Sequence, residues 1–364
     1  MNEPHGSPLR PLLFGLLGLV VGMGIGYALF TFTPQCRERL QEAQRAAESG
    51  APTPLAAPAS TAQERIFFIG SQGEKDGIYV INPDGSDRRF LVETPDMLHD
   101  QQFSISRDGR HLAYLGPKDT ISVMQTDGSG KRLLVPHSDW AVYDPAISPD
   151  GTLVVFPRDD GLYRIDADGS NLQRLTITKK DYIDIAPQFS PDGRQVAFLR
   201  AVASSDAGGD LLIVDLDSRV ERKLNGPGYS GTPLWSSNGR YVLSYWIVEG
   251  EDEGGFSVLD TRGKDIVHVD HALYPAFSPT DDLIAYHNCV SDTPGVNFMQ
   301  ADSSGKQPLS NAKHADSQPV FSPDGQRLLV TQWDDQGNST IYLLNKDGSG
   351  RKELTKGHHP QWVR

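Results

Sequence analysis

The hydrophobic residues of the chain follow two different patterns. One uninterrupted apolar segment without a charge, Leu12–Phe32, lies near the N-terminus. From Arg65 onward, short runs rich in Val, Ile and Phe alternate with Pro, Asp and Gly. Runs of this kind are typical of β-strands that are bounded by tight turns. The pattern therefore predicts one membrane-spanning helix followed by an all-β domain.

The all-β part consists of a repeated unit. Its clearest copy is Ser190–Arg200 (SPDGRQVAFLR), a Ser-Pro-Asp-Gly turn followed by an apolar strand. Pro191 sets φ at the first corner of the turn, and Gly193 supplies a residue with positive φ. Related turns begin at five further serines, which are Ser106, Ser148, Ser236, Ser278 and Ser322. The six serines are 42 to 46 residues apart, which is the length of one four-stranded propeller blade.

The two ends of the repeated region complement each other. Seven segments match the third strand of the repeat, but only six turns of the Ser-Pro-Asp-Gly type are present. The C-terminal His359–Val363 matches the strand before a turn, and Arg65–Ile69 matches the strand after one. Pairing of these segments, with Trp362 between neighbouring sheets, closes a ring without exposed edges. We therefore predict a seven-bladed β-propeller over residues 65–364, with a six- or eight-bladed ring as the alternative.

The residues before the propeller divide into a tail (1–11), a transmembrane helix (12–32), and a juxtamembrane helix with a Pro/Ala-rich linker (33–64). Leu12–Phe32 is long enough to cross a hydrocarbon core of about 30 Å. It lacks the small-residue cleavage site of a signal peptide, which favours an uncleaved single-pass anchor. Gly18, Gly22 and Gly26 are spaced by four and predict a face for helix dimerisation, hence a homodimer. The alternative is that glycine is simply frequent in membrane helices.

The arginines around this segment give an orientation. Arg10 precedes the segment, whereas Arg37, Arg39 and Arg45 follow it. The positive-inside rule therefore places the propeller in the cytoplasm.

Composition and motifs exclude several functions. The net charge of −13 argues against a nucleic-acid partner, which requires a basic stripe. Cys36 and Cys289 are far apart and predict no structural disulfide. The repeated turn aspartates are expected to cap their own turns rather than to bind calcium. No motif for nucleophilic catalysis is present, and we expect no catalytic residues, no metal and no cofactor.

Polar and aromatic residues gather just before the predicted inner strands, which lead to one mouth of the central channel. They are Asp100, Gln102, Asp144, Asp184, Tyr229, His271, Tyr274, His314, Asp316 and His359. A ring of carboxylates, imidazoles and aromatic groups is typical of a binding site for a metal or cationic ligand. The alternative is the solvated polar mouth that most propellers have. Two acidic inserts, Ala203–Gly209 and Glu249–Gly255, predict a further rim for a basic partner. The alternative is that these loops are simply solvated.

The repeat sequence consists of Pro-x-Phe-Ser-Pro-Asp-Gly, a strand and an Asp-Gly-Ser turn. It resembles the propeller repeats of TolB and its PD40-type relatives. The resemblance covers residues 65–364. It implies an extracytoplasmic, non-catalytic interaction module at the cell envelope, with a protein or glycan partner on one propeller face. This orientation is opposite to the one that the arginines give. TolB itself has six blades, and its N-terminal domain has no counterpart here.

A second resemblance is to oligogalacturonate lyase, a seven-bladed PD40-type enzyme whose channel mouth holds a metal through histidines and a glutamine. His271, His314, His359 and Gln318 are loose counterparts of that set. The acidic chain is a poor host for a polyanionic sugar. We therefore expect a membrane-anchored, non-enzymatic protein-interaction or scaffold module. The alternatives are a metal-dependent polysaccharide lyase and a glycan-binding propeller.

Overall fold

The computed structural model describes residues 64–72, 75–94, 103–137, 144–158, 160–203, 208–224, 228–247, 254–262, 266–288, 295–309, 316–334 and 336–364. Within these ranges the chain is all-β and contains no helix. Accordingly, the described residues include no helix that could cross a membrane. The predicted anchor Leu12–Phe32, with Gly18, Gly22 and Gly26, lies outside them.

The strands form seven consecutive units, each with an inner, a second, a third and an outer strand in that order. Unit 1 contains β28 (His358–Val363), β1 (Arg65–Gln72), β2 (Lys75–Ile81) and β3 (Arg89–Glu93). Unit 2 contains β4 (Phe103–Ile105), β5 (His111–Gly116), β6 (Thr120–Gln125) and β7 (Arg132–Val135). Unit 3 contains β8 (Ala146–Ile147), β9 (Leu153–Arg158), β10 (Gly161–Asp166) and β11 (Gln173–Arg174).

Units 4 and 5 belong to one eight-stranded sheet, in which the single pair Gly209↔Tyr229 joins them. Unit 4 contains β12 (Tyr182–Phe189), β13 (Gln195–Val202), β14 (Gly209–Asp215) and β15 (Glu221–Lys223). Unit 5 contains β16 (Tyr229–Trp235), β17 (Tyr241–Ile247), β18 (Gly254–Asp260) and β19 (Ile266–Asp270). Unit 6 contains β20 (Ala272–Phe277), β21 (Leu283–Asn288), β22 (Gly295–Gln300) and β23 (Gln307–Pro308). Unit 7 contains β24 (Ser317–Phe321), β25 (Arg327–Trp333), β26 (Ser339–Asn345) and β27 (Lys352–Lys356).

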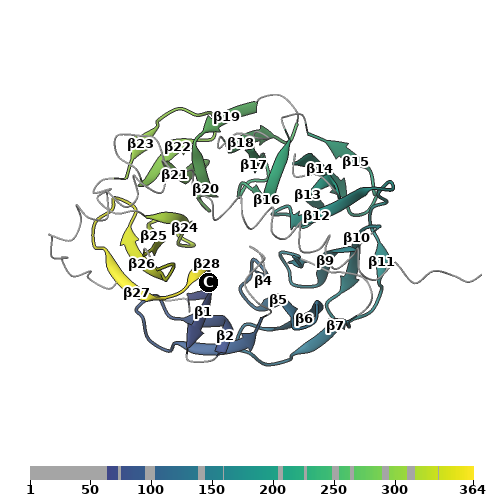
Figure 1. Ribbon diagram of the computed structural model, residues 1–364, viewed down its shortest axis with the longest axis horizontal. Helices are drawn as coiled ribbons and strands as arrows, with labels where there is room; N and C mark the ends of the chain where they lie inside the picture. Colours follow the sequence, from purple (N-terminus) through teal and green to yellow (C-terminus); the bar gives the residue numbers. More distant parts are fainter. Residues whose placement is uncertain are drawn as a thin grey trace, which may run out of the picture.

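The units stand side by side around a common centre, with the inner strands nearest to it (Figure 1). Buried apolar side chains form seven clusters, and each cluster combines residues of two neighbouring units. The strands alternate between core-facing positions and the opposite face, so each sheet contributes to two clusters. Burial of apolar area between the sheets is therefore the main force that holds the units together.

Units 7 and 1 meet at the two ends of the described chain. β28 pairs with β1 in an antiparallel manner, with Ile66 opposite Trp362, as predicted for these two segments. Trp362 is buried in a cluster to which units 1 and 7 both contribute. Its indole nitrogen donates to Glu64 Oε2 (3.2 Å), and the same oxygen accepts from Arg327 (2.7 Å). The first and last described segments are thus joined by strand pairing, apolar packing and a shared carboxylate.

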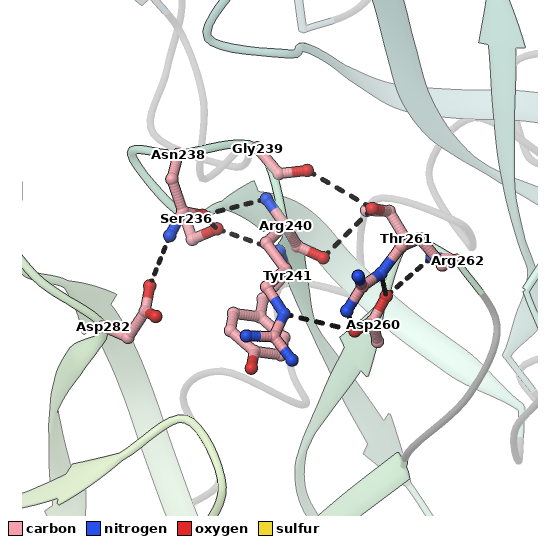
Figure 2. Close-up of polar contacts among 9 residues, drawn as sticks. All are labelled: Ser236, Asn238, Gly239, Arg240, Tyr241, Asp260, Thr261, Arg262 and Asp282. Atoms are coloured by element: carbon pink, nitrogen blue, oxygen red, sulfur yellow. Dashed lines mark hydrogen bonds and ion pairs between the residues drawn. The ribbon is translucent and has the colours of Figure 1, made fainter.

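One end of the ring, which we call the turn end, carries the turns between inner and second strands. In unit 5 the Ser236 hydroxyl donates to Asn238 Oδ1 (2.8 Å) and accepts from the Tyr241 amide (2.9 Å) (Figure 2). In four other units, an aspartate such as Asp192 takes the place of the asparagine (Ser190 Oγ to Asp192 Oδ1, 2.6 Å). The turn residues therefore cap their own turns, as predicted. Asn238 also donates to Asp282 (2.8 Å), which links units 5 and 6.

Candidate functional site

The opposite end of the ring, which we call the mouth end, is where the inner strands begin. Consecutive strands in each unit are antiparallel, so this end also carries the loops between second and third strands and the connections between units. Unlike the turns, these segments differ in sequence from unit to unit. The mouth end is therefore where side chains specific to this protein are concentrated.

The residue before the inner-strand proline has an unusual backbone in most units. Its φ lies in the left-handed region in five of them: Asp144 (34°), Ala186 (52°), Tyr274 (50°), Gln318 (48°) and His359 (49°). In unit 5 the left-handed residue is Gly231 (66°), two positions before its proline. Pairing with the second strand shifts register at this point in units 1, 4, 5, 6 and 7. The inner strands of these five units thus share a bulge at the mouth end.

These bulges are costly and informative. A left-handed non-glycine residue costs on the order of 1–3 kcal/mol and persists only where its surroundings fix it. A following proline adds a further steric restriction. Gly231 escapes this cost, whereas five other units carry Asp, Ala, Tyr, Gln or His in the left-handed conformation. The fold therefore holds the backbone at these positions in a defined conformation at the mouth end.

Bulge residues of neighbouring units contact each other between units 7 and 1. Gln318 Nε2 lies 3.4 Å from His359 Nε2, and the His359 amide points to Gln318 Oε1 at 3.4 Å. His359 Nδ1 is 2.6 Å from His358 Nδ1. The ring of His358 packs against Trp333 with a centroid distance of 5.4 Å. Gln318, His359, His358 and Trp333 form a contiguous group, which we call the mouth cluster.

The imidazoles of the mouth cluster are neutral at physiological pH. Burial lowers the pKa of His358 to about 4. Burial, together with the neighbouring His358, lowers the pKa of His359 to about 3. A neutral imidazole has one donor and one acceptor nitrogen, so one Nδ1 donates to the other across their 2.6 Å contact. The cluster therefore offers neutral hydrogen-bonding groups beside an aromatic ring.

Asp184, predicted to line the mouth, is instead fully buried inside unit 4. Its carboxylate receives the Arg200 guanidinium at both oxygens (2.7 and 2.9 Å) and the Thr176 hydroxyl (2.5 Å). Thr176 also accepts from the Leu162 amide (2.8 Å). Since Thr176 follows β11 and Asp184 lies on β12, this network joins units 3 and 4. Asp184 thus has a structural role. Pairing of Arg200 with Asp184 and Glu221 raises the pKa of Arg200.

Asp316 and Tyr229 are also buried rather than turned to the channel. Asp316 is paired with the Arg351 guanidinium, and its carbonyl oxygen is 2.7 Å from Nδ1 of the buried His287. Tyr229 is 1% exposed, and burial raises its pKa to about 12. Both residues lie at the predicted end of the ring, the mouth end, but they are buried inside the protein rather than turned to the channel.

His271 occupies the short link between β19 and β20, with a left-handed φ of 53°, and it is half-buried, as are Asp144 and Tyr274. These three belong to units 3, 5 and 6 and their connections, and the structure places them at the mouth end. Asp100, Gln102 and His314 lie outside the described residues, as do most of the two acidic inserts. Trp333 was not among the predicted site residues. The x-Pro step that recurs in or before the inner strands of six units, all but unit 2, is the sequence signal that marks the bulge.

Metal binding needs several ligands that converge on one point. Among the described residues, no three His, Cys, Asp or Glu side chains gather closely enough to hold a metal ion. Gln318 and His359 are in contact, whereas His271 belongs to the link between units 5 and 6. The described part of the lyase-like set therefore does not by itself make a metal centre.

Comparison with known proteins supports the fold. No family model matches the chain. The chain is similar to "Protein TolB homolog" of Chlorobaculum tepidum, with 28% identity over 104 residues; the match spans 28% of this chain and only 24% of that relative. Among solved structures, the oligogalacturonate lyase of Vibrio parahaemolyticus has a TM-score of 0.60 at 15% identity, covering 77% of this chain and 85% of that one. An oligogalacturonate lyase in complex with manganese has a TM-score of 0.58 at 14% identity, with the same coverage. The chain contains a TolB-like β-propeller.

Proposed function

We propose that the chain is a closed, seven-bladed β-propeller that acts as a non-catalytic protein-interaction module and binds its partner at the mouth end. In this proposal Leu12–Phe32 anchors the chain in a membrane, with the propeller outside the cytoplasm. Each of the seven units is one blade.

The seven apolar clusters support the blade count. Six of them join units that follow each other along the chain, and the seventh joins unit 7 to unit 1. A ring of this kind leaves no inner sheet edge for aggregation. The pairing of β28 with β1 completes unit 1 with the four-strand order of the other units.

The observation that supports a binding role is that several ionisable side chains at the mouth end are either paired or neutral. Asp184 and Asp316 are paired with arginines, His287 contacts a carbonyl oxygen, and His358 and His359 are kept neutral. A general acid or base needs a pKa near the working pH, and the two mouth-cluster histidines have values well below it. The bulges fix the backbone that carries these side chains, which lowers the entropic cost of binding. This combination favours recognition over catalysis.

Site-directed photocrosslinking in the full chain tests this proposal. A photoreactive amino acid at His271, at the mouth end, should form a discrete crosslinked product in the native membrane. The same amino acid at Asp127, in an exposed Asp-Gly-Ser turn at the other end, is the matched control and should form none. Crosslinks at Asp127 alone would contradict a mouth-end partner.

The membrane orientation has its own test. The Pro/Ala-rich linker Gly50–Ala62 should be cut by protease added to intact spheroplasts, which would release the propeller. Protection until the membrane is lysed would support the cytoplasmic orientation that Arg37, Arg39 and Arg45 predict.

A metal-dependent lyase is the second candidate, because the fold is similar to two oligogalacturonate lyases and Gln318 contacts His359. We expect the purified full chain, incubated with manganese, to retain no stoichiometric metal and to release no unsaturated product from oligogalacturonate. About one manganese per chain, lost in both His314→Ala and His359→Ala, would favour the lyase instead.

A further inference from the structure

Among the described residues, large apolar side chains that are strongly exposed to solvent lie in one sector of the ring. Among the described residues, those that are strongly exposed are Leu133 (55%), Leu172 (51%), Ile177 (68%), Tyr182 (39%) and Val220 (64%). All five belong to units 2–4 or to the connection between units 3 and 4. Exposed apolar groups gathered on one side of a soluble domain commonly mark an interaction surface.

The sector runs along the outside of the ring and continues at the mouth end over the connection between units 3 and 4, up to the first residue of the inner strand β12. The outer strands β7, β11 and β15 follow one another there (Figure 1). Side chains bridge the neighbouring units, because Arg132 donates to the Asp168 carbonyl and Arg219 donates to Gln173 (2.9 Å). We define the outer strip as residues 131–137, 171–182 and 219–224, which are these strands with their flanks. It excludes the Asp-Gly-Ser turns at the turn end.

The outer strip is basic although the whole chain carries a charge of −13. Its three segments contain eight Lys and Arg residues and only two acidic residues, a net charge of +6. Two of these cations pair with acidic side chains outside the strip, in the ion pairs Arg174–Asp160 and Lys223–Asp210. One of the acidic residues, Glu221, is itself paired with Arg200. The strip therefore remains positive after local pairing.

The strip is also ordered before any partner arrives. Between units 3 and 4, the Thr178 amide donates to the Asp160 carbonyl and the Tyr182 amide donates to the Lys179 carbonyl (3.1 Å each). The Thr176–Asp184–Arg200 network fixes both ends of this connection. Lys179 and Lys180, both exposed, are thus presented between the exposed Ile177 and Tyr182. Preorganisation of this kind lowers the cost of binding.

We infer that the outer strip of units 2–4, which reaches the mouth end only at the connection between units 3 and 4, is a second docking surface, distinct from the mouth cluster of units 7 and 1, for an acidic protein segment that carries apolar side chains. Apolar side chains of the partner cover Ile177, Tyr182 and their neighbours, and its carboxylates face the lysines and arginines. Because the rest of the propeller is acidic, such a segment is repelled elsewhere and directed to this strip.

The test uses the full chain in nanodiscs of phosphatidylcholine and a fluorescent peptide that alternates glutamate with leucine. We expect binding that weakens with added salt, and much weaker binding of the same peptide with glutamine in place of glutamate. Reversing both charges (Lys179→Glu with Lys180→Glu) should weaken peptide binding about tenfold or more, in line with the loss of complementary charge at an interface. Ile177→Ser should weaken it several-fold. The control Lys306→Glu, exposed at the outer rim of unit 6, should leave it unchanged.

Equal binding of both peptides, or binding that the double variant does not weaken, would overturn the inference. So would a preference of the strip for vesicles with phosphatidylglycerol, which would assign an anionic membrane surface, or a dimer that the double variant dissociates, which would assign a second copy of the chain. Gln318→Ala, at the mouth, should not change peptide binding. A negative result in the peptide-binding test therefore does not contradict the mouth-end proposal. A negative result in the photocrosslinking test likewise does not contradict the outer-strip proposal.

Discussion

The two ends of the ring are built from the same strands but follow opposite rules. At the turn end a buried serine recurs in six units and bonds to the residue two positions later, which is aspartate in four of them. At the mouth end the bulge recurs, but the side chain on it changes from unit to unit. The recurring turn residues thus maintain the scaffold at the turn end, whereas the variable side chains at the mouth end can be specific for one partner.

The largest expected effect comes from removing the pairing of β28 with β1, on which both ends of the ring depend. Deleting residues 357–364 removes β28 and leaves β1 without its inner partner. It also removes Trp362, and truncation of such a buried aromatic residue alone costs about 3–5 kcal/mol. We expect the shortened full chain to aggregate and to melt at a clearly lower temperature, measured by calorimetry and light scattering. An exposed tail would instead tolerate the deletion.

The next effect tests whether Asp184 belongs to the scaffold despite its place near the mouth. Asp184→Ala removes one partner of a buried ion pair, a change that typically costs about 3–5 kcal/mol of unfolding free energy. We expect a loss of about 3 kcal/mol, at the lower end of this range, because Glu221 still pairs with Arg200. Chemical denaturation measures the loss. The control Asp210→Ala breaks an exposed pair and should cost less than about 1 kcal/mol. Equal losses in the two variants would contradict the structural role of Asp184.

The two ends should also respond to acid in different pH ranges. Histidine in the unfolded chain has a pKa near 6.5, whereas burial lowers the pKa of His358 to about 4 in the folded chain. As pH falls from 6.5 toward 4, the unfolded state binds protons that the folded state does not, so stability decreases, by on the order of 3 kcal/mol for His358. His358→Gln should flatten the dependence of unfolding free energy on pH in this range.

The turn end contributes at lower pH. The Ser190 hydrogen bond lowers the pKa of Asp192 below its ordinary value. The resulting stability is present above that ordinary value and is lost as pH falls below it. Between pH 6.5 and 5 the loss should therefore arise from histidines, and an unchanged slope in His358→Gln would show that His358 is not held neutral.

The smallest effect concerns backbone strain. Glycine adopts the left-handed region readily, so Ala186→Gly relieves strain but loosens the unfolded chain. The two contributions partly cancel, and we expect a change in unfolding free energy between zero and about 1 kcal/mol in favour of the variant. A clear loss of stability, measured by denaturation, would show that the bulge is not strained.

The sequence predicted the scaffold well because scaffold information is local. Ser190, Asp192 and Gly193 specify their turn within four residues, and the 42- to 46-residue spacing repeats it. The pairing of β28 with β1 followed from comparing the two ends of the repeat. These features need no knowledge of the folded chain.

The mouth was predicted less completely because its details depend on distant partners. Asp184 was assigned to the channel, but Arg200, from the neighbouring strand, holds it inside the unit. Asp316 is held in the same way by Arg351, which is 35 residues away. The left-handed bulge is a backbone property that no residue type at that position announces, since Ala, Asp, Tyr, Gln and His all adopt it. Trp333 joins the mouth cluster only through tertiary packing.

One matched pair of variants tests the division between the two ends most directly. Gln318 and Ser322 lie four residues apart in unit 7, at the mouth and at the turn end. We predict that Gln318→Ala costs less unfolding free energy than Ser322→Ala, because its contacts to His359 are long at 3.4 Å, but abolishes the crosslink formed from His271 in the full chain. Ser322→Ala removes a buried hydroxyl that three groups use, and it should cost about 1–3 kcal/mol while the crosslink is retained. The reverse pattern, with stability lost at Gln318 and the crosslink lost at Ser322, would contradict the account.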